Sequence, residues 1–148
     1  MRVTVVGGSN ISESEAELAA DVGRLLAQRG HVLVCGGLGG VMAAACRGAR
    51  EADGHTIGIL PGEDRSAANE YVQEAIATGL GHARNALVVM NGDAVIAIDG
   101  GGGTLSELGY ATVFDRPVAG LRTHDVPGVR PMRDPEAAVE YVESKADS

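Results

Sequence analysis

The 148-residue sequence has no tryptophan, one phenylalanine and three tyrosines. With so few aromatic side chains, the core has to be built from alanine, valine, leucine and isoleucine, a mixture that suits a parallel sheet covered by helices. No apolar run reaches the ~18 residues of a membrane-spanning helix, and the N-terminal residues show no cleavable signal pattern. We therefore expect a cytoplasmic protein without a membrane partner, and a single domain over residues 1–148.

Lysine is almost absent, because Lys145 stands alone beside eleven arginines, and the formal net charge is −8. A protein that neutralises nucleic-acid phosphates needs a basic face, and the sequence shows none. Cys35 and Cys46 lie in apolar surroundings without a CxxC motif or paired histidines. We expect both cysteines to be core residues, and we expect neither a nucleic-acid partner nor a metal site.

Several familiar motifs are also missing. Met42 and Ser106 stand where G-x-G-x-x-G would need its third glycine, and GxxxxGK[ST] is absent because the one lysine is Lys145. There is no G-x-S-x-G elbow, and the four histidines lack metal-ligand spacing. These absences argue against a dinucleotide dehydrogenase and a P-loop NTPase. His82 lies near the glycine turns described below, and we expect it to face solvent or stabilise a loop.

The sequence does contain a regular alternation of short β-branched runs and helical periodicity. Strands are predicted at 3–6, 31–35, 55–60, 73–78, 93–98 and 117–121, and helices at 12–29, 41–52 and 104–115. Residues 71–78 fit a helix and a strand equally well, and the strand at 73–78 is the prediction made there. Residues 83–91 also fit either state, and 123–133, with two prolines and a glycine, are predicted to be a loop.

Helix ends carry their own signals. Gly30 and Gly54 are predicted to end the first two helices, and Asp134 to cap a last helix with Pro135 at its first position. Strands that alternate with helices predict an α/β fold: a single Rossmann-like, doubly wound parallel sheet with right-handed crossovers and helices on both faces.

Four glycine turns follow predicted strands, at 7–8, 36–40, 79–81 and 100–103. Ligands of an open parallel sheet bind beyond the carboxyl ends of its strands, where the strand order reverses. Glycine lets the backbone present N–H groups there, and each helix N-terminus adds about half a positive charge. One such turn is explained by chain geometry alone, but four at one edge predict a site for a phosphate-bearing, nucleotide-like small molecule.

The turns supply the candidate site residues. Those expected to bind phosphate or nucleotide are Gly8, Ser9, Gly36, Gly37, Gly39, Gly40, Met42, Gly100, Gly101, Gly102, Gly103 and Thr104. Glu107 lies in the first turn of the helix predicted from Thr104, near the expected phosphate. Its carboxylate is either a functional group or only a favourable charge at a helix N-terminus.

Three segments resemble one family. Gly100-Gly-Gly-Gly-Thr-Leu-Ser-Glu107 resembles the PGGxGTxxE signature of the LONELY GUY (LOG) proteins, which are cytokinin-activating phosphoribohydrolases. Residues 35–42 resemble their GGGxxGLMG segment, and Gly81-His-Ala-Arg84-Asn85 is similar to their MHxRK element, whose arginine is important for activity. The order and spacing agree from residue 3 to about 121.

The sequence also departs from the LOG pattern, since Asp99 replaces the proline and Asn85 the lysine. A subgroup with a GGGxGTLSE run and an ARN element is closer, and it includes proteins similar to molybdenum-cofactor carriers, which bind a phosphorylated pterin without an assigned hydrolysis. The resemblance implies a homodimer or larger homo-oligomer. The alanine-rich helix predicted at 41–52 is a candidate for the partner-facing surface.

Two functions stay open. As an enzyme, the protein would hydrolyse the N-glycosidic bond of a nucleoside 5'-monophosphate, with Glu107 stabilising charge or activating water and Arg84 holding the phosphate or assisting the leaving group. As a carrier or sensor, it would use the same site without chemistry, and fold alone does not separate the two. No cofactor is expected to be required, although a nucleotide, phosphate or molybdopterin-type ligand would fit either reading.

Overall fold

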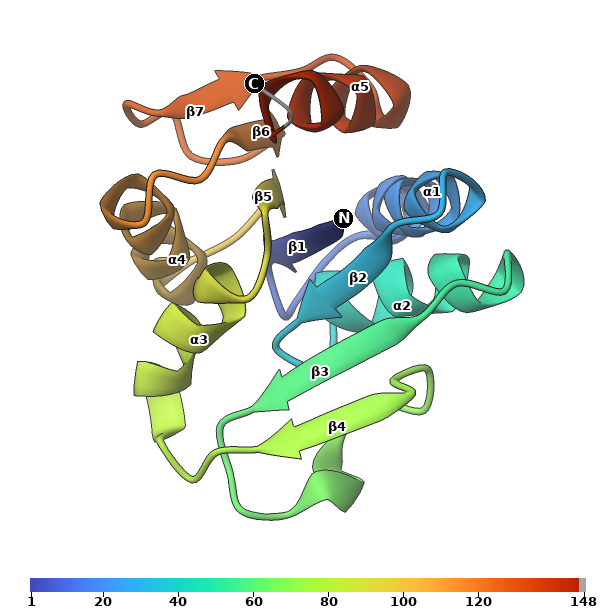
Figure 1. The fold of residues 1–148 in the computed structure, drawn as a ribbon, viewed down its shortest axis with the longest axis vertical. Helices are drawn as coiled ribbons and strands as arrows, with labels where there is room; N and C mark the ends of the chain where they lie inside the picture. Colours follow the sequence, from blue (N-terminus) through green and yellow to red (C-terminus); the bar gives the residue numbers. More distant parts are fainter. Residues whose placement is uncertain (147–148) are drawn as a thin grey trace.

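The computed structural model describes residues 1–146, and within them seven strands form one parallel sheet in the order β4-β3-β2-β1-β5-β6-β7. The strands are β1 (Arg2–Gly7), β2 (Val32–Cys35), β3 (Thr56–Leu60), β4 (Glu74–Ala77), β5 (Ala94–Ile98), β6 (Val118–Leu121) and β7 (Val129–Pro131). The order reverses at β1, which pairs with β2 on one side and β5 on the other (Figure 1). The predicted doubly wound, Rossmann-like sheet is confirmed.

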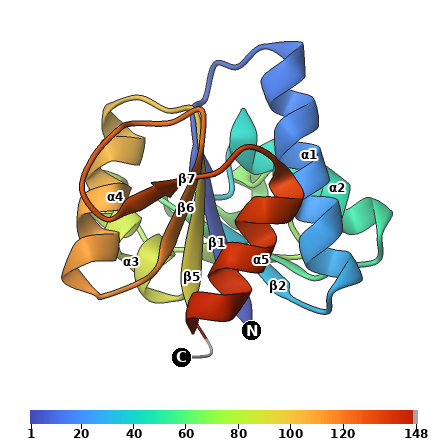
Figure 2. The same cartoon turned by 90° about the horizontal axis from the view of Figure 1, so that it is seen from above.

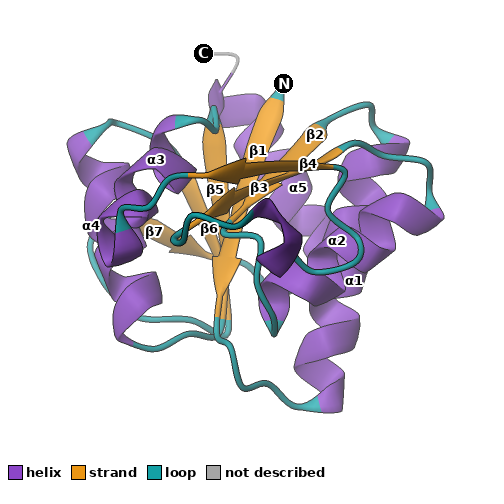
Figure 3. Cartoon of the chain, turned by 90° about the horizontal axis from the view of Figure 1, so that it is seen from below, coloured by secondary structure: helices purple, strands orange, loops and turns teal. Residues whose placement is uncertain are grey.

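Helices cover both faces of the sheet (Figures 1 and 2), and Figure 3 shows the same layers from the opposite side. One face carries α1 (Glu13–Gln28), α2 (Val41–Glu51) and α5 (Pro135–Ala146), and the other carries α3 (Arg84–Met90) and α4 (Gly102–Val113). Two short 3-10 turns, η1 (Arg65–Ala67) and η2 (Gly81–Ala83), lie in the connections. Among the helices of residues 1–146, none has the length and apolar character that a membrane crossing requires.

The alternation of side chains along the strands builds two cores. On β1, Val3 and Val5 belong to the cluster under α1, α2 and α5, whereas Val6 belongs to the cluster under α3 and α4. Successive residues of a strand point to opposite faces, so a nearly continuous apolar run serves both layers. The scarcity of aromatic side chains is met by valine, isoleucine, leucine and alanine, as the composition predicts.

The helix α1 is closed at both ends by its own sequence. Ser12 accepts a hydrogen bond from the N–H of Glu15 at 3.2 Å, and the Glu15 carboxylate accepts one from the N–H of Ser12 at 3.0 Å. At the other end Gly30 adopts a φ of 78°, and the N–H of His31 donates to the Leu26 carbonyl at 2.9 Å. Gly30 therefore ends the helix as predicted, because a left-handed residue there directs the backbone back onto the last turn.

The structure corrects the predicted end of α2 by one residue and confirms the predicted start of α5. The left-handed residue after α2 is Asp53, with a φ of 59°, and Gly54 follows it and donates to the Ala49 carbonyl at 2.8 Å. The predicted stop at Gly54 is thus one residue late, because an aspartate tolerates this conformation. At α5, Asp134 accepts from the N–H of Ala137 at 2.8 Å, which confirms it as the N-cap.

The structure corrects the secondary structure predicted for 123–133 and decides between helix and strand for 83–91. The predicted loop 123–133 contains β7, a three-residue strand at the sheet edge that pairs with β6. The loop prediction was wrong here because so short an edge strand, ending in Pro131, carries no alternating pattern. Residues 84–90, which fitted either state, form α3. The helix predicted from Thr104 begins two residues earlier, at Gly102.

The small residues of α2 are used within the chain. At the crossing of α1 and α2, a Cβ added to Gly48 would collide with the carbonyl oxygen of Ala20, and one added to Gly23 with that of Ala45. The two helices therefore approach at backbone distance. The idea that the alanine-rich helix 41–52 faces a partner was wrong, since its small-residue face is buried against α1.

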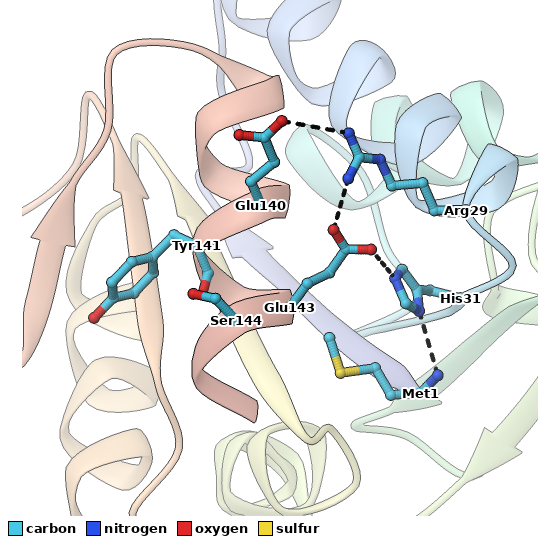
Figure 4. A network of polar contacts seen from close by, with 7 residues as sticks. All are labelled: Met1, Arg29, His31, Glu140, Tyr141, Glu143 and Ser144. Atoms are coloured by element: carbon cyan, nitrogen blue, oxygen red, sulfur yellow. Dashed lines mark hydrogen bonds and ion pairs between the residues drawn. The ribbon is translucent and has the colours of Figure 1, made fainter. Parts of the chain in front are cut away.

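A polar network holds α5 against the starts of β1 and β2 (Figure 4). The Glu143 carboxylate lies 2.7 Å from Arg29 Nη1 and 2.7 Å from His31 Nε2, and the Met1 amino group lies 3.3 Å from His31 Nδ1. Burial alone would raise the pKa of Glu143, but the hydrogen bonds from His31 and Arg29 hold it below its usual value. The network lies at the end of the sheet away from the glycine turns.

Candidate functional site

A cavity of about 300 Å³ lies where the strand order reverses, beyond the carboxyl ends of β1 and β5. We call it the glycine-loop cavity, and its lining is Val5, Val6, Gly7, Gly8, Ser9, Gly36, Met42, His82, Arg84, Asn85, Gly101, Gly102, Gly103, Thr104 and Glu107. Segments from the turns after β1, β2, β4 and β5 meet here because every strand is parallel and ends at the same edge.

Close packing explains why two of the lining positions are glycine. A Cβ on Gly36 would lie 2.7 Å from Arg84 Nη2 and 2.8 Å from the Met42 sulfur. A Cβ on Gly8 would collide with the Asp99 carboxylate. Both residues therefore let the cavity wall approach groups that any side chain would displace.

Arg84 begins α3 and is only 8% exposed. Its Nε donates to the Ile59 carbonyl at 2.9 Å, its Nη2 to the Gly36 carbonyl at 3.4 Å, and its Nη1 to the side-chain oxygen of Asn85. Burial lowers the pKa of the guanidinium, while the nearby Glu107 carboxylate raises it. An arginine remains charged under these conditions, so the cavity contains a fixed positive charge.

Glu107 lies in the second turn of α4 and is likewise only 8% exposed. Burial raises the pKa of its carboxyl to about 7, against the lowering effect of the Arg84 charge. Removal from water disfavours the ionised form, and the arginine compensates for part of that cost. A carboxyl that titrates near neutrality in a cleft is a functional-site candidate on physical grounds.

The first turn of α4 opens into the cavity. Gly101 is the N-cap and makes no side-chain capping bond, and Gly102, Gly103 and Thr104 follow it along the wall. The preceding Asp99 has a φ of 54°, a conformation closed to the proline that the LOG pattern has there. The amide groups of an uncapped helix start are suited to an anion.

The structure brings most of the predicted site residues together. Gly8, Ser9, Gly36, Met42, Gly101, Gly102, Gly103, Thr104, Arg84 and Glu107 all line the cavity. Four candidates lie outside the lining: Gly37, Gly39, Gly40 and Gly100. Three of these have positive φ, and Gly40 packs against the backbone of Gly8 and Ser9, so they shape the turns.

Five lining residues were not among the predicted site residues: Val5, Val6, Gly7, His82 and Asn85. Asn85 is 4% exposed and bonds to Arg84, although the sequence marked it only as a departure from a motif. His82, expected to face solvent or stabilise a loop, is exposed and also lines the cavity. A second hollow of about 400 Å³, the side hollow, adjoins it and is lined by His82, Ala83, Asn85, Gly102, Gly103, Ser106 and Tyr110.

The two cysteines lie behind the glycine-loop cavity in the core. Cys35 and Cys46 are free and buried, with their sulfurs 3.5 Å apart, and the Cys35 sulfur accepts from the N–H of Gly37 at 3.3 Å. Their expected role as core residues is confirmed. Within residues 1–146, no group of three or more histidine, cysteine, aspartate or glutamate side chains is arranged to hold a metal ion.

The fold and the motifs around Arg84 and Glu107 place the chain in the LOG-like superfamily of Rossmann-like proteins. Within that superfamily it belongs to the SLOG cluster4 family, whose model matches residues 1–147. The resemblance seen in the sequence is thereby confirmed.

Relatives of two kinds are similar to the chain. The molybdenum cofactor binding protein of Rippkaea orientalis is 36% identical with a TM-score of 0.91, over 97% of this chain and 96% of that one. The molybdenum cofactor carrier protein MCP of Chlamydomonas reinhardtii is 29% identical with a TM-score of 0.88, over 99% and 98%. The cytokinin riboside 5'-monophosphate phosphoribohydrolase of Mycobacterium tuberculosis is 41% identical over 112 residues, and the match covers 69% of this chain and 59% of that enzyme.

Proposed function

We propose that the glycine-loop cavity binds a nucleoside 5'-monophosphate and that the protein hydrolyses its N-glycosidic bond, releasing the free base and ribose 5-phosphate. The observation that carries this proposal is the burial of Glu107 and Arg84 in one cavity beside the open first turn of α4. The name of the mycobacterial relative supports the same class of reaction. The hydrolysis requires no cofactor.

In this reaction the bond between the anomeric carbon and the base nitrogen breaks, and its electron pair leaves on the base. The oxygen of a water molecule bonds to the same carbon, and the proton that water loses balances the one that the base gains. The transition state is oxocarbenium-like, so a nearby carboxylate stabilises it. With a pKa of about 7, Glu107 is partly ionised at neutral pH. A general acid or base is most efficient when its pKa lies near the operating pH.

The phosphate is held, in this proposal, by the backbone N–H groups from Gly101 to Thr104 and by the charge of Arg84. Charge-assisted hydrogen bonds to phosphate are each worth about 1.5–3 kcal/mol, and the helix N-terminus adds a favourable dipole. The side hollow lies next to these phosphate-binding groups and is large enough to receive a heterocyclic base.

A second candidate is a carrier or sensor of a phosphorylated pterin such as the molybdenum cofactor. The observation that favours it is coverage: both molybdenum-cofactor structures match nearly the whole chain, whereas the chain spans little more than half of the mycobacterial enzyme. A carrier would use the same phosphate-binding groups, and a protonated Glu107 would not repel the ligand.

A base-release assay with a panel of nucleoside monophosphates, beside calorimetry with AMP, separates the two functions. For a hydrolase, Glu107→Gln lowers turnover at least ~100-fold while AMP affinity changes by no more than a few-fold. Arg84→Ala weakens both, and wild-type turnover rises with pH through about 7 as Glu107 ionises.

The control is Glu17→Gln, which removes the same charge from an exposed position on α1. It should leave turnover and affinity unchanged. A wild-type protein that binds AMP but releases no base over hours would contradict the hydrolase, and tight binding of a phosphorylated pterin would then support the carrier.

We also propose that the protein self-associates through α3 and α4. Met90, Leu105 and Val113 on these helices are 45%, 45% and 74% exposed, whereas the small-residue face of α2 is already covered. Light scattering should give at least a dimeric mass, and Leu105→Asp together with Val113→Asp should lower it. A monomeric wild type would contradict the proposal.

A further inference from the structure

The side chain of Asn85 forms the middle of a hydrogen-bonded chain that joins Arg84 to the first turn of α4. The side-chain oxygen of Asn85 accepts from Arg84 Nη1, and its Nδ2 donates to the Ser106 hydroxyl at 3.1 Å. The Ser106 hydroxyl in turn donates to the Gly103 carbonyl at 2.7 Å. The chain thus runs from a buried cation on α3 to the helix that carries Glu107.

The direction of these bonds makes an amide the fitting group at position 85. Arg84 can only donate, so it needs an acceptor on the neighbouring side chain. Ser106 uses its one proton on Gly103, so it needs a donor from the other side. A neutral amide supplies an acceptor at one end and a donor at the other, whereas a carboxylate supplies only acceptors.

The remaining bonds of Arg84 show how much Asn85 contributes to its orientation. The Nε bond to Ile59 is well formed at 2.9 Å, but the Nη2 bond to Gly36 is long at 3.4 Å. A bond of that length is weak. Asn85 therefore holds the guanidinium at Nη1, while the Gly36 carbonyl holds Nη2 only loosely.

The acceptors that Arg84 meets among the described residues are also uncharged: two backbone carbonyls and one amide. A carboxylate in direct contact would neutralise the guanidinium and compete with an incoming anion. The Asn85 amide orients the guanidinium without neutralising it, because the group in direct contact with the cation is uncharged.

We propose that Asn85 is a positioning residue, which orients Arg84 toward the ligand phosphate and preserves its positive charge for that contact. This inference rests on the proposed phosphate-binding function of the same cavity. It assigns a role to the position at which this chain departs from the RK pair of the LOG pattern.

The test compares three variants with wild type, using AMP as the probe in calorimetry. Asn85→Asp should weaken AMP binding at least ~10-fold, because it pairs Arg84 with a carboxylate, and Asn85→Ala about threefold, because it only releases the guanidinium. The matched control is Asn91→Asp, the same change at the exposed end of α3, which should bind AMP within twofold of wild type. Asn85→Asp binding within twofold of wild type would overturn the inference.

Two ligand-free readouts keep this test separate from that of the proposed function. In nitrogen-15 NMR spectra, the Nη–H signals of Arg84 should be resolved in wild type and averaged by rotation in Asn85→Ala. The Glu107 titration should move upward by about half a pH unit or more in Asn85→Asp, since a new negative charge lies near it, and stay in place in Asn91→Asp. If wild type fails to bind AMP, the proposed function fails. Identical Arg84 spectra in wild type and Asn85→Ala overturn the positioning role.

Discussion

The two helical layers bury different kinds of residue. The buried positions of α1, α2 and α5 are apolar side chains or glycines, with the two small-residue helices in backbone contact. On the other face, α3 begins with the buried Arg84 and Asn85, and α4 buries Thr104 and Glu107 in its first two turns; the buried apolar residues follow these polar ones.

Helix capping differs between the helices that border the cavity and those that do not. Ser12 and Asp134 cap α1 and α5 with their own side chains, whereas Gly40, Ala83 and Gly101 at the starts of α2, α3 and α4 make no side-chain cap. Buried polar groups and uncapped helix starts cost stability unless a partner satisfies them. The helices away from the cavity thus complete their own capping, whereas the helix starts that border it leave interactions available for a ligand.

The largest effect should come from the tightly packed face. Gly48→Ala would place a methyl group against the Ala20 carbonyl, where backbone must move, and should lower the free energy of unfolding by about 3 kcal/mol. Its control, Gly109→Ala on α4, has no atom within 4 Å of the new Cβ and should raise stability by about 0.5–1 kcal/mol. Urea titration measures both, and equal effects would remove the contrast between the layers.

The second expected effect is a dependence of stability on pH, which arises from Glu107 in the glycine-loop cavity. The folded pKa of Glu107 is about 7, above its usual 4.5, so the folded state binds the proton more tightly and stability is lost as the pH rises from about 4.5 through 7. The shift corresponds to about 3 kcal/mol at most.

The variant Glu107→Gln removes this loss because its side chain does not ionise. It should be more stable than wild type at pH 8, by up to about 3 kcal/mol, and equal to it near pH 4. Thermal unfolding across this range measures the difference. A constant offset between the two proteins at every pH would show that burial of the charge is not its cause.

A smaller effect should follow from adding a side-chain cap to the start of α4, where Gly101 supplies none. Gly101→Asp fits the observed φ of −112° and places a carboxylate over the first N–H groups of α4. We expect it to raise stability by about 1 kcal/mol and to lower AMP affinity at least ~10-fold, because the carboxylate takes the place of the phosphate. Stability and affinity that change in the same direction would contradict this division of roles.

The smallest effect should come from removing a side-chain cap on the other face, at the start of α1. Ser12→Ala removes the capping box of α1 and should lower the free energy of unfolding by about 1 kcal/mol. AMP affinity should not change, since Ser12 does not line the glycine-loop cavity. Denaturant unfolding and calorimetry on the same sample test both parts, and weakened AMP binding would link this cap to the site.

The sequence predicted the regular parts of the fold because their signals are local. The strand and helix periods, Gly30 and Asp134 each act within a few residues of where they stand. The strand β7 was missed because its only support is pairing with β6, a contact that leaves no pattern in three residues. Helix α3 could not be distinguished from a strand, since its apolar run is short.

The site was predictable to a similar extent. Glycines after parallel strands imply convergence at one edge, which correctly brought Gly8, Gly36 and Gly101 together. The connection from Asn85 through Ser106 joins residues 21 positions apart, and nothing in the sequence indicates the direction of its hydrogen bonds. The raised pKa of Glu107 likewise arises from burial that only the assembled fold creates.

The central place of β1 has a consequence for synthesis on the ribosome. Its pairing with β5 joins Val3 to Ala94, so one edge of the first strand stays open until some ninety residues have been translated. A nascent chain that has reached Glu107 holds every residue lining the cavity, yet it still lacks Ala138, Val139 and Val142, which are wholly buried in the core. The growing chain therefore holds all of the lining residues before the helix α5, which covers part of one face of the sheet, has been made, and exposed apolar sheet surface of this kind favours aggregation.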